Sequence, residues 1–460
     1  MNILNRIVAY KKDEVKELHQ QHDIEKLKEE VTPSPISLYE TIREKKANRE
    51  YFIITEFKRK SPSEGWINQD LKVDEQVTDY KQKGASAVSV LTDTPSFGGG
   101  YTDLEVASKA LENSGLLVLQ KEFIIDPIQI YLARKHGANM ILLIASILSA
   151  KEMGELKAVA ESLNMGVLAE VHSIAEYEKI ADLKFPVVGV NNRNLSNFKT
   201  AINCCNYIAK NIDFDGFMIA ESGIASELDL RIAQQNASGF LIGTSLMRNA
   251  KSLDFKALTE KKYFFKACGM RTRELIELET ADLVGVNFSP ISKRRIDEGK
   301  LRSWLDEGSK TPANTVAVFK ENARKEVHEV VANYGFHYVQ LYADDFAPDF
   351  VSQIKQKVIL AISIQSEKDL ELAEQYAPFI DLFILDGAKP GSGEAIESNI
   401  PKDFPYPFLL AGGMNSTNLH RLQHYDNCIG VDMASGIETE GKVDESKIED
   451  VKKGLTNLKS

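Results

Sequence analysis

The segment FIITEFKRKSPS, residues 52–63, begins as an apolar strand and ends in closely spaced charges. Successive strand residues point to opposite faces, so Glu56, Lys58 and Lys60 share one face. Strands of parallel α/β barrels are apolar and buried on both faces, and chemistry collects at their carboxyl ends. The segment therefore predicts a barrel strand that directs charge into the barrel mouth. The plainer alternative is a self-neutralising ion pair with no chemical role.

Short apolar runs of this kind recur along the chain, and each is followed by a longer stretch of helical period. Each half of the sequence contains eight of them, at 52–58, 87–92, 116–123, 140–145, 166–171, 187–192, 217–222 and 239–244, and then at 264–269, 283–288, 315–320, 338–343, 358–363, 382–387, 408–413 and 429–434. Eight βα units close into a (β/α)8 barrel, whereas a doubly wound sheet usually has fewer strands and a glycine-rich fingerprint. We expect an α/β fold of two tandem TIM barrels, 1–258 and 259–460, the first with an N-terminal helical extension.

Composition and charge limit the possible partners. The formal net charge of the 460 residues is −11, so no global positive field attracts nucleic acid or an anionic membrane. The four cysteines form neither a disulfide framework nor a zinc spacing, and the histidines lack a metal-binding pattern. We find no signal segment and no apolar run of about 20 residues. We expect a cytoplasmic monomer with no metal and no cofactor.

Polar residues end several other strands of the first half. They are Lys121 with Glu122 on the third, Glu170 on the fifth, Asn191, Asn192 and Arg193 on the sixth, and Glu221, Ser222 and Gly223 on the seventh. Lysines and carboxylates that meet in a barrel mouth from which water is excluded shift one another's pKa values, which is how general acids and bases are tuned. This convergence predicts a catalytic site.

Glycines after the last two strands of each half predict phosphate sites, because loop amides and a helix N-terminus meet an anion there in many barrels. The candidates are Gly223, Gly243 and Thr244 in the first half, and Gly412, Gly413, Ala434 and Ser435 in the second. We therefore expect small phosphorylated, anionic substrates. In the second half, Cys268 and Asp386 end the first and sixth strands, which suits a base and an acid on two sides of one substrate. A lone buried cysteine is more often inert.

The first half closely resembles indole-3-glycerol-phosphate synthases. The matching residues are the 56–63 signature, 97–99, 119–123, 169–172, 191–195, 221–224 and 243–247. The resemblance implies a substrate, 1-(2-carboxyphenylamino)-1-deoxyribulose 5-phosphate, that is cyclised, decarboxylated and dehydrated. It implies Lys121 as general acid and Glu170 as base or as stabiliser of cationic charge. Lys58 would hold the carboxylate.

The same resemblance implies supporting roles for other residues of the first half. Glu56 and Glu221 would orient the catalytic groups and the sugar hydroxyls, and Asn191 and Arg193 would position the substrate. Substrate and phosphate binding would fall to Lys60, Ser61, Ser222, Gly223, Gly243 and Thr244.

The second half resembles phosphoribosylanthranilate isomerases, through 266–269, 292–294, 339–341, 385–386, 391–393, 412–413 and 431–438. That family catalyses an Amadori rearrangement whose product is the first half's substrate. The resemblance implies that Asp386 protonates the furanose oxygen, that Cys268 removes the C2 proton and that Arg294 contacts the anthranilate carboxylate. Gly412, Gly413, Ala434 and Ser435 would hold the phosphate.

Two departures from the second family stand close to its catalytic strands. The usual Leu-His-Gly after the fourth strand is Leu341-Tyr342-Ala343 here, and Ala267 stands between Lys266 and Cys268. Two alternatives remain open: a silent second barrel that serves as a binding or stabilising module, and a different phosphosugar isomerase, such as one of histidine biosynthesis. Isomerases of histidine biosynthesis typically use a pair of aspartates at the ends of the first and fifth strands. The first strand of the second half has Cys268 at its end instead.

Overall fold

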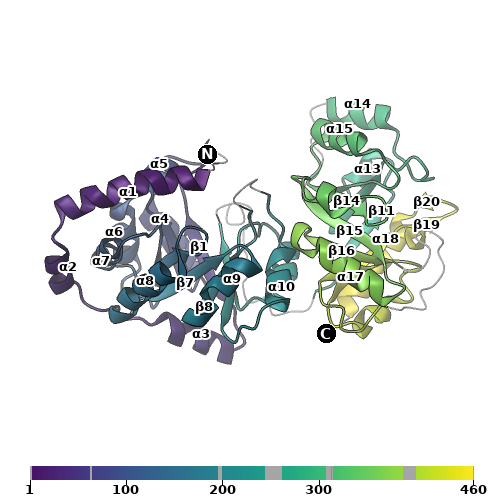
Figure 1. Cartoon of the computed structure of the whole chain (residues 1–460). Helices are drawn as coiled ribbons and strands as arrows, with labels where there is room; N and C mark the ends of the chain where they lie inside the picture. The colour runs from purple at the N-terminus through teal and green to yellow at the C-terminus, as the bar shows by residue number, and fades with distance from the viewer. Residues whose placement is uncertain are drawn as a thin grey trace. The chain divides into compact units, whose positions relative to one another are not determined.

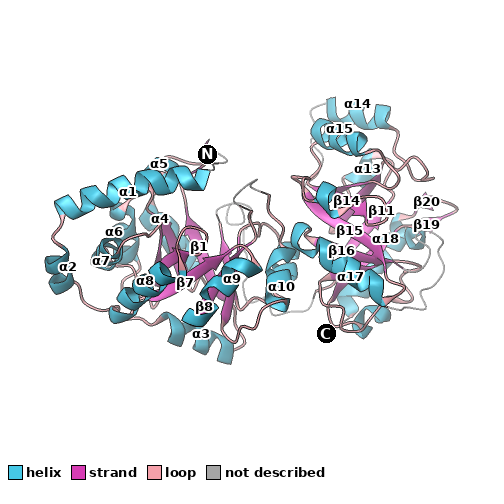
Figure 2. Cartoon of the chain, viewed as in Figure 1, coloured by secondary structure: helices cyan, strands magenta, loops and turns pink. Residues whose placement is uncertain are grey.

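The computed structural model describes residues 3–62, 65–194, 199–243, 262–306, 312, 314–386 and 400–458. The chain divides into two compact units. One comprises Met1–Phe198 and Ile208–Thr259, and the other comprises Lys199–Tyr207 and Glu260–Ser460. The expected boundary between residues 258 and 259 lies outside the described residues and stays a prediction. In each half, the strands of Figure 2 lie inside surrounding helices.

Eight parallel strands close the first barrel. They are β1 (Phe52–Phe57), β4 (Ala87–Leu91), β5 (Leu117–Lys121), β6 (Met140–Ile144), β7 (Gly166–Val171), β8 (Val187–Asn191), β9 (Phe217–Glu221) and β10 (Gly239–Ile242). Closure occurs where β1 pairs with β10, with Phe52 opposite Gly239. The helices that alternate with these strands are α4 (Val73–Gln82), α5 (Thr94–Phe97), α6 (Tyr101–Ala110), α7 (Pro127–Lys135), α8 (Ala150–Ser162), α9 (Ile174–Ile180), α10 (Asn203–Lys210) and α11 (Glu227–Ala233).

The N-terminal extension forms α1 (Ile3–Gln21), α2 (Ile24–Glu30) and α3 (Leu38–Ala47), at the purple end of Figure 1. Helix α3 begins where the Ser37 side chain accepts the Glu40 amide hydrogen. Its Leu38 packs in the apolar cluster that includes Phe52 of β1. At the start of β7, a side chain on Gly166 would place its Cβ 2.4 Å from Leu38 Cβ. Helix α3 therefore packs against the amino ends of the strands, and the chemistry is left to the carboxyl ends.

The second barrel closes in the same way. Its strands are β11 (Phe264–Cys268), β12 (Leu283–Asn287), β13 (Thr315–Val318), β14 (Tyr338–Tyr342), β15 (Lys357–Ser363), β16 (Leu382–Asp386), β17 (Phe408–Leu410) and β18 (Cys428–Met433). The helices around it are α13 (Arg273–Ile276), α14 (Glu298–Asp306), α15 (Arg324–Tyr334), α16 (Pro348–Val351), α17 (Glu367–Tyr376) and α18 (Glu445–Asn457). The two tandem TIM barrels and the helical extension predicted from the sequence are thus confirmed.

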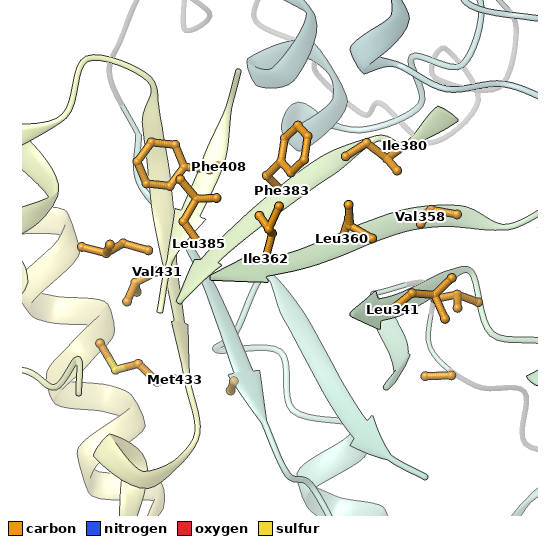
Figure 3. Close-up of a cluster of buried hydrophobic side chains, with 14 of the residues drawn as sticks. Leu341, Val358, Leu360, Ile362, Ile380, Phe383, Leu385, Phe408, Val431 and Met433 are labelled. Carbon is orange, nitrogen blue, oxygen red and sulfur yellow. The ribbon is translucent and has the colours of Figure 1, made fainter. Parts of the chain in front are cut away.

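Alternation along the strands decides which residues reach the interior of the second barrel. Figure 3 shows an apolar cluster that includes Leu385 of β16 and Met433 of β18, and both pack in the main core of this unit. Because neighbours in a strand point to opposite faces, Asp386 and Asp432 point the other way, into the barrel. Among the helices of the described ranges, none has the length and hydropathy to cross a lipid bilayer.

Candidate active sites in the two barrels

The centre of the first site is Lys121, the last residue of β5. Its Nζ lies 2.5 Å from Glu221 Oε2 and 3.3 Å from Glu170 Oε2. Burial disfavours its charge, but the carboxylates of Glu221 and Glu170 outweigh this and raise the pKa of Lys121. Lys121 is therefore an ammonium held at the ends of three strands, and it has a proton to donate.

A second charged pair lies at the end of β1. Lys58 Nζ donates to Glu56 Oε1 at 2.7 Å. Burial of Glu56 opposes ionisation, yet the positive charges of Lys58 and Lys121 outweigh it and lower the pKa of Glu56. A Cβ on Gly243, after β10, would stand 3.7 Å from Glu56 Oε1 and 3.9 Å from Lys58 Nζ, so the backbone of Gly243 borders this pair.

Glu170, near the end of β7, is held from several sides. His172 Nε2 lies 3.3 Å from Glu170 Oε1, while Nδ1 of the same ring lies 3.1 Å from Glu176 Oε2. Burial favours the protonated acid, but Lys121, His172 and a hydrogen bond with Asn191 lower the pKa of Glu170. Glu170 is therefore an anion, as a base or a stabiliser of positive charge must be.

Glu221, at the end of β9, has the opposite electrostatic balance. Burial and the negative charge of Glu170 together outweigh the attraction of Lys121 and raise the pKa of Glu221 to about 7. Its Oε1 accepts no hydrogen bond within the described ranges. Room for this carboxylate is made by Gly189 of β8, where a Cβ would lie 2.1 Å from Oε1. A strand glycine at a site of close approach was the sequence signal for this contact.

Asn191 and Arg193 follow β8 beside this cluster. Asn191 Oδ1 accepts the Arg193 amide hydrogen at 3.0 Å, which fixes the turn out of the strand. The guanidinium of Arg193 is among the positive charges that lower the pKa of Glu56. Its Nε is buried and has no hydrogen-bond partner in the described part of the chain. Arg193 therefore has a donor to offer to a substrate.

Lys60 and Ser61 lie apart from the central cluster, in the hairpin of β2 (Lys60–Ser61) with β3 (Gly65–Trp66). Lys60 Nζ donates to the Pro95 carbonyl oxygen at 2.8 Å and lies 5.5 Å from the centre of the Trp66 ring. The hairpin is thus tied to helix α5, which follows β4. Sequence reasoning placed Lys60 on the face of Glu56 and Lys58, and the hairpin gives it different neighbours.

In both barrels, two successive residues of the loop after the seventh strand have positive φ. Ser222 and Gly223 after β9 have φ of 65° and 83°, and Gly412 and Gly413 after β17 have φ of 81° and 64°. Left-handed residues turn backbone amides towards a shared concavity, a common way to bind anions. Thr244, another expected phosphate residue of the first barrel, lies outside the described residues.

In the second barrel this loop contacts the loop after the eighth strand. Gly436 approaches it so closely that a Cβ would lie 2.0 Å from the Met414 carbonyl oxygen. Ala434 and Ser435 immediately precede this contact, and Ser435 begins the 3-10 turn Ser435–Ile437. The four expected phosphate residues of the second barrel therefore lie on two adjoining loops.

Cys268 ends β11, and its thiol packs against β12. A Cβ on Gly285 of β12 would lie 2.8 Å from Cys268 Sγ, so this strand glycine makes room for the sulfur as Gly189 does for Glu221. Burial raises the pKa of the Cys268 thiol, and Lys266 opposes the effect. Lys266 also bonds Asp432, which faces it in the adjacent strand β18. The sequence pattern assigned a role to neither Lys266 nor Asp432.

Arg294 lies over the carboxyl end of β11. Its Nε and Nη2 donate to the two carboxylate oxygens of Glu438, each at 2.7 Å. At Gly269, with φ of 92°, a Cβ would stand 2.7 Å from Arg294 Cδ. The bidentate pair fixes the guanidinium beside Cys268, where it is available to a substrate carboxylate.

The two departures from the family pattern have different consequences. Ala267 is fully buried in the outer core of the second barrel and does not line the site. Tyr342 ends β14 and accepts a hydrogen bond from Gln340 Nε2 at 3.3 Å. Burial and the nearby groups Cys268, Asp432 and Asp386 raise the pKa of Tyr342. Its phenol therefore stays protonated among the catalytic residues, and the sequence pattern did not predict Tyr342 as a site residue.

In the described part of the chain, no three His, Cys, Asp or Glu side chains form a group that could hold a metal ion. The chemistry derived for both sites uses only amino-acid side chains and backbone amides.

Family models match the two halves separately, and relatives match almost the whole chain. The family model of indole-3-glycerol phosphate synthase matches residues 4–258, and that of N-(5'phosphoribosyl)anthranilate (PRA) isomerase matches residues 266–453. The tryptophan biosynthesis protein TrpCF of Helicobacter pylori is 31% identical over 449 residues, 95% of each chain. A multifunctional tryptophan biosynthesis protein of Schizosaccharomyces pombe is 30% identical over 91% of this chain, which spans only 60% of that relative. The match to the solved phosphoribosyl anthranilate isomerase of Thermotoga maritima covers 43% of this chain and 100% of that chain, with 27% identity and a TM-score of 0.37.

Proposed function

The chain belongs to the family of bifunctional tryptophan-biosynthesis enzymes that join an indole-3-glycerol phosphate synthase to a phosphoribosylanthranilate isomerase, and from this premise we propose which residues perform each reaction. The second barrel isomerises N-(5-phosphoribosyl)anthranilate, and the first converts the product to indole-3-glycerol phosphate. The observation that supports the assignment best is Lys121, an ammonium held 2.5 Å from Glu221 and 3.3 Å from Glu170.

In the synthase barrel, the aromatic ring attacks the substrate carbonyl, so oxygen must gain a proton while the ring gains positive charge. Lys121 is the general acid for the carbonyl and later for the departing hydroxyl. Glu170, kept anionic by its neighbours, stabilises the cationic ring and acts as the base. Lys58, nearest the solvent in its pair with Glu56, holds the carboxylate that leaves as carbon dioxide.

Glu221, Asn191 and Arg193 orient the reacting groups in this barrel. Glu221 bonds Lys121 through one carboxylate oxygen and keeps the other for a sugar hydroxyl. Ser61, Ser222, Gly223, Gly243 and Thr244 bind the phosphate, and Lys60 reaches it by leaving the Pro95 carbonyl oxygen.

In the isomerase barrel, acid and base act on the same sugar. Asp386 protonates the furanose oxygen and opens the ring, and the nitrogen of the resulting imine carries positive charge. Cys268, as thiolate, then removes the C2 proton, and the electrons of that C–H bond form the C1–C2 double bond of an enol. Arg294, fixed by Glu438, binds the anthranilate carboxylate. Gly412, Gly413, Ala434 and Ser435 bind the phosphate.

A coupled assay tests these assignments on the full chain. Starting from phosphoribosylanthranilate, the loss of anthranilate-type fluorescence reports the isomerase, and the appearance of indole absorbance reports the synthase. Lys121→Ala should lower synthase turnover by about 10² to 10⁴-fold and leave the isomerase intact, because a positioned acid typically contributes that much. Synthase activity within a factor of a few of wild type would refute the acid assignment.

Cys268→Ser and Asp386→Asn are the matched variants for the second barrel. The first should abolish most isomerase activity, because a hydroxyl is a far weaker base than a thiolate. The second should do so because an amide cannot deliver the ring-opening proton. Synthase activity measured on the isolated intermediate is the control for folding. A wild-type protein that cannot isomerise phosphoribosylanthranilate would instead favour a silent second barrel.

The cellular setting is part of the proposal. Cys204, Cys205, Cys268 and Cys428 are all free thiols, which suits a reducing cytoplasm. A monomer that binds only small anionic substrates, and neither nucleic acid nor membrane, stays a prediction. Sedimentation of the purified chain tests the monomer.

A further inference from the structure

Lys266 is a buried cation to which the proposed reaction gives no role. It lies inside β11, two residues before Cys268, and its side chain has no solvent exposure. Its Nζ lies 2.7 Å from Asp432 Oδ1, and because strand residues two apart share a face, Lys266 and Cys268 lie side by side on the inner face of β11. An ammonium is costly to bury, so its contacts indicate what it does there.

The contacts of Lys266 connect it to the proposed base. A thiolate removes a proton and a thiol does not, so Cys268 needs a cation in contact to counter its burial. The other charged or titratable groups that act on Cys268 are Asp432, Arg294 and Tyr342. Arg294 is engaged by Glu438, and Tyr342 carries no positive charge. Lys266 is the buried cation on the same face of β11, and its positive charge is the largest of the influences that lower the pKa of Cys268.

Asp432 has the opposite effect on the same sulfur. Its carboxylate holds Lys266 in register across the β11–β18 pairing, and its negative charge also disfavours a thiolate nearby. A lone ammonium would stabilise the thiolate so strongly that it became a weak base. Shared between carboxylate and sulfur, the ammonium stabilises the thiolate only in part.

We propose that Lys266 and Asp432 form a buried couple that sets the proton affinity of Cys268, with Lys266 favouring the thiolate and Asp432 limiting that effect. Both are positioning residues in this proposal, because Lys266 has no exposed surface and Asp432 acts on Cys268 through its ion pair with Lys266 and through its charge. The inference rests on the proposed role of Cys268 as the base. During the reaction the thiolate takes the C2 proton and becomes a thiol, and the ammonium of Lys266 keeps its own protons throughout.

Alkylation of Cys268 by iodoacetamide measures its thiolate fraction directly, independently of turnover. The full-length protein is treated over a range of pH, and the modified peptide is quantified by mass spectrometry. Lys266→Met should move the alkylation midpoint to higher pH by about one unit or more, which slows the reaction roughly tenfold at a fixed pH below the midpoint. Asp432→Asn should move the midpoint to lower pH. Lys266→Arg, which keeps the charge, should stay near wild type.

Three controls separate this effect from unfolding. Cys428, buried in β18 of the same barrel, should stay unlabelled in every variant that remains folded. Synthase activity should stay unchanged. Because Lys266→Met leaves the carboxylate of Asp432 without its cation, the double variant Lys266→Met with Asp432→Leu provides a folded chain with neither charge. Its alkylation midpoint should lie above that of wild type, because burial then raises the pKa of Cys268 with only Arg294, which is paired with Glu438, left to oppose it.

The pH dependence of the isomerase should follow the same order. Its kcat/KM rises with pH as Cys268 loses its proton, so the rising limb should move up in Lys266→Met and down in Asp432→Asn. The proposal is wrong if both single variants shift the alkylation midpoint in the same direction, or if neither shifts it. If the midpoints shift as expected but Cys268→Ser still isomerises normally, the couple stands and the base assignment fails instead.

Discussion

Lys11 of helix α1 offers a quantitative test of how the N-terminal extension is held. Its side chain is fully buried, and its Nζ lies 3.1 Å from Asp93 Oδ2, 3.0 Å from Glu122 Oε1 and 2.8 Å from Glu14 Oε2. Asp93 and Glu122 are as deeply buried as Lys11, and Glu122 directly follows the catalytic Lys121. Lys11→Met fills similar volume but leaves two buried carboxylates without their cation. Breaking a buried pair in this way typically costs about 3 to 5 kcal/mol of stability.

Urea unfolding of the first barrel measures this loss. The chain has two tryptophans, Trp66 in the first barrel and Trp304 in the second, so a Trp304→Phe background lets Trp66 emission report the first barrel alone. With an m value of about 3 kcal/mol/M, the urea midpoint should fall by about 1 to 1.7 M. The control is Lys16→Met on the same helix, whose exposed partner Asp13 contributes under about 1 kcal/mol.

The pH dependence of the Lys11→Met defect gives a second readout. Burial already raises the pKa of Glu122, and loss of the ammonium raises it further. The folded variant therefore binds a proton more tightly than the unfolded chain, and its stability recovers as the pH falls. A Lys11→Met protein that unfolds at the urea midpoint of Lys16→Met would refute the view that this ion cluster holds α1.

Three further outcomes follow from the site geometry. Synthase kcat/KM should fall as pH rises through about 7, because ionised Glu221 strengthens the hold of Lys121 on its proton. Glu221→Gln should remove this fall in activity, and a fall that survives the substitution would belong to another group. Gly189→Ala should lower synthase turnover at least roughly tenfold with an unchanged circular dichroism spectrum. The new Cβ would lie 2.1 Å from Glu221 Oε1 and displace that flexible carboxylate, whereas Leu168 Cδ1, at 3.1 Å, needs to move only slightly. Tyr342→Phe should slow the isomerase by roughly 5- to 30-fold, the cost of about 1 to 2 kcal/mol for a lost hydrogen bond, and an unaffected rate would exclude the phenol from the reaction.

The barrel architecture could be predicted because it depends on local periodicity. Strands buried on both faces give continuous apolar runs, and two sets of eight such runs left few alternatives. The strand ends were less predictable. The run expected at 116–123 ends as a strand at Lys121. Glu122 belongs to a different cluster, because its partner Lys11 comes from the N-terminal helix and no local pattern reveals that contact.

Parts of both sites depend on neighbouring strands and could not be predicted from one strand alone. Asp432 meets Lys266 only because β18 closes the barrel against β11. Likewise, Gly189 matters only because Glu221 leans across from the next strand. In both cases the sequence did contain a signal, a charged residue or a glycine inside an otherwise apolar strand. Its meaning became clear only once the residue opposite it in the barrel was known.

Each barrel pairs a buried lysine with a carboxylate, but the first lysine acts as an acid and the second supports a base. The position of each lysine along its strand explains the difference. Lys121 is the last residue of its strand, and 13% of its side chain is exposed at the mouth, where it can donate a proton to a bound substrate. Lys266 lies two residues before the end of its strand with no exposure, and Cys268 stands between it and the mouth. A lysine at that depth cannot reach the substrate, so it acts only through the residue above it. The carboxylate partner of each lysine adjusts its effect. Glu221 holds the acid Lys121 in place, and Asp432 weakens the effect of Lys266 on the base Cys268.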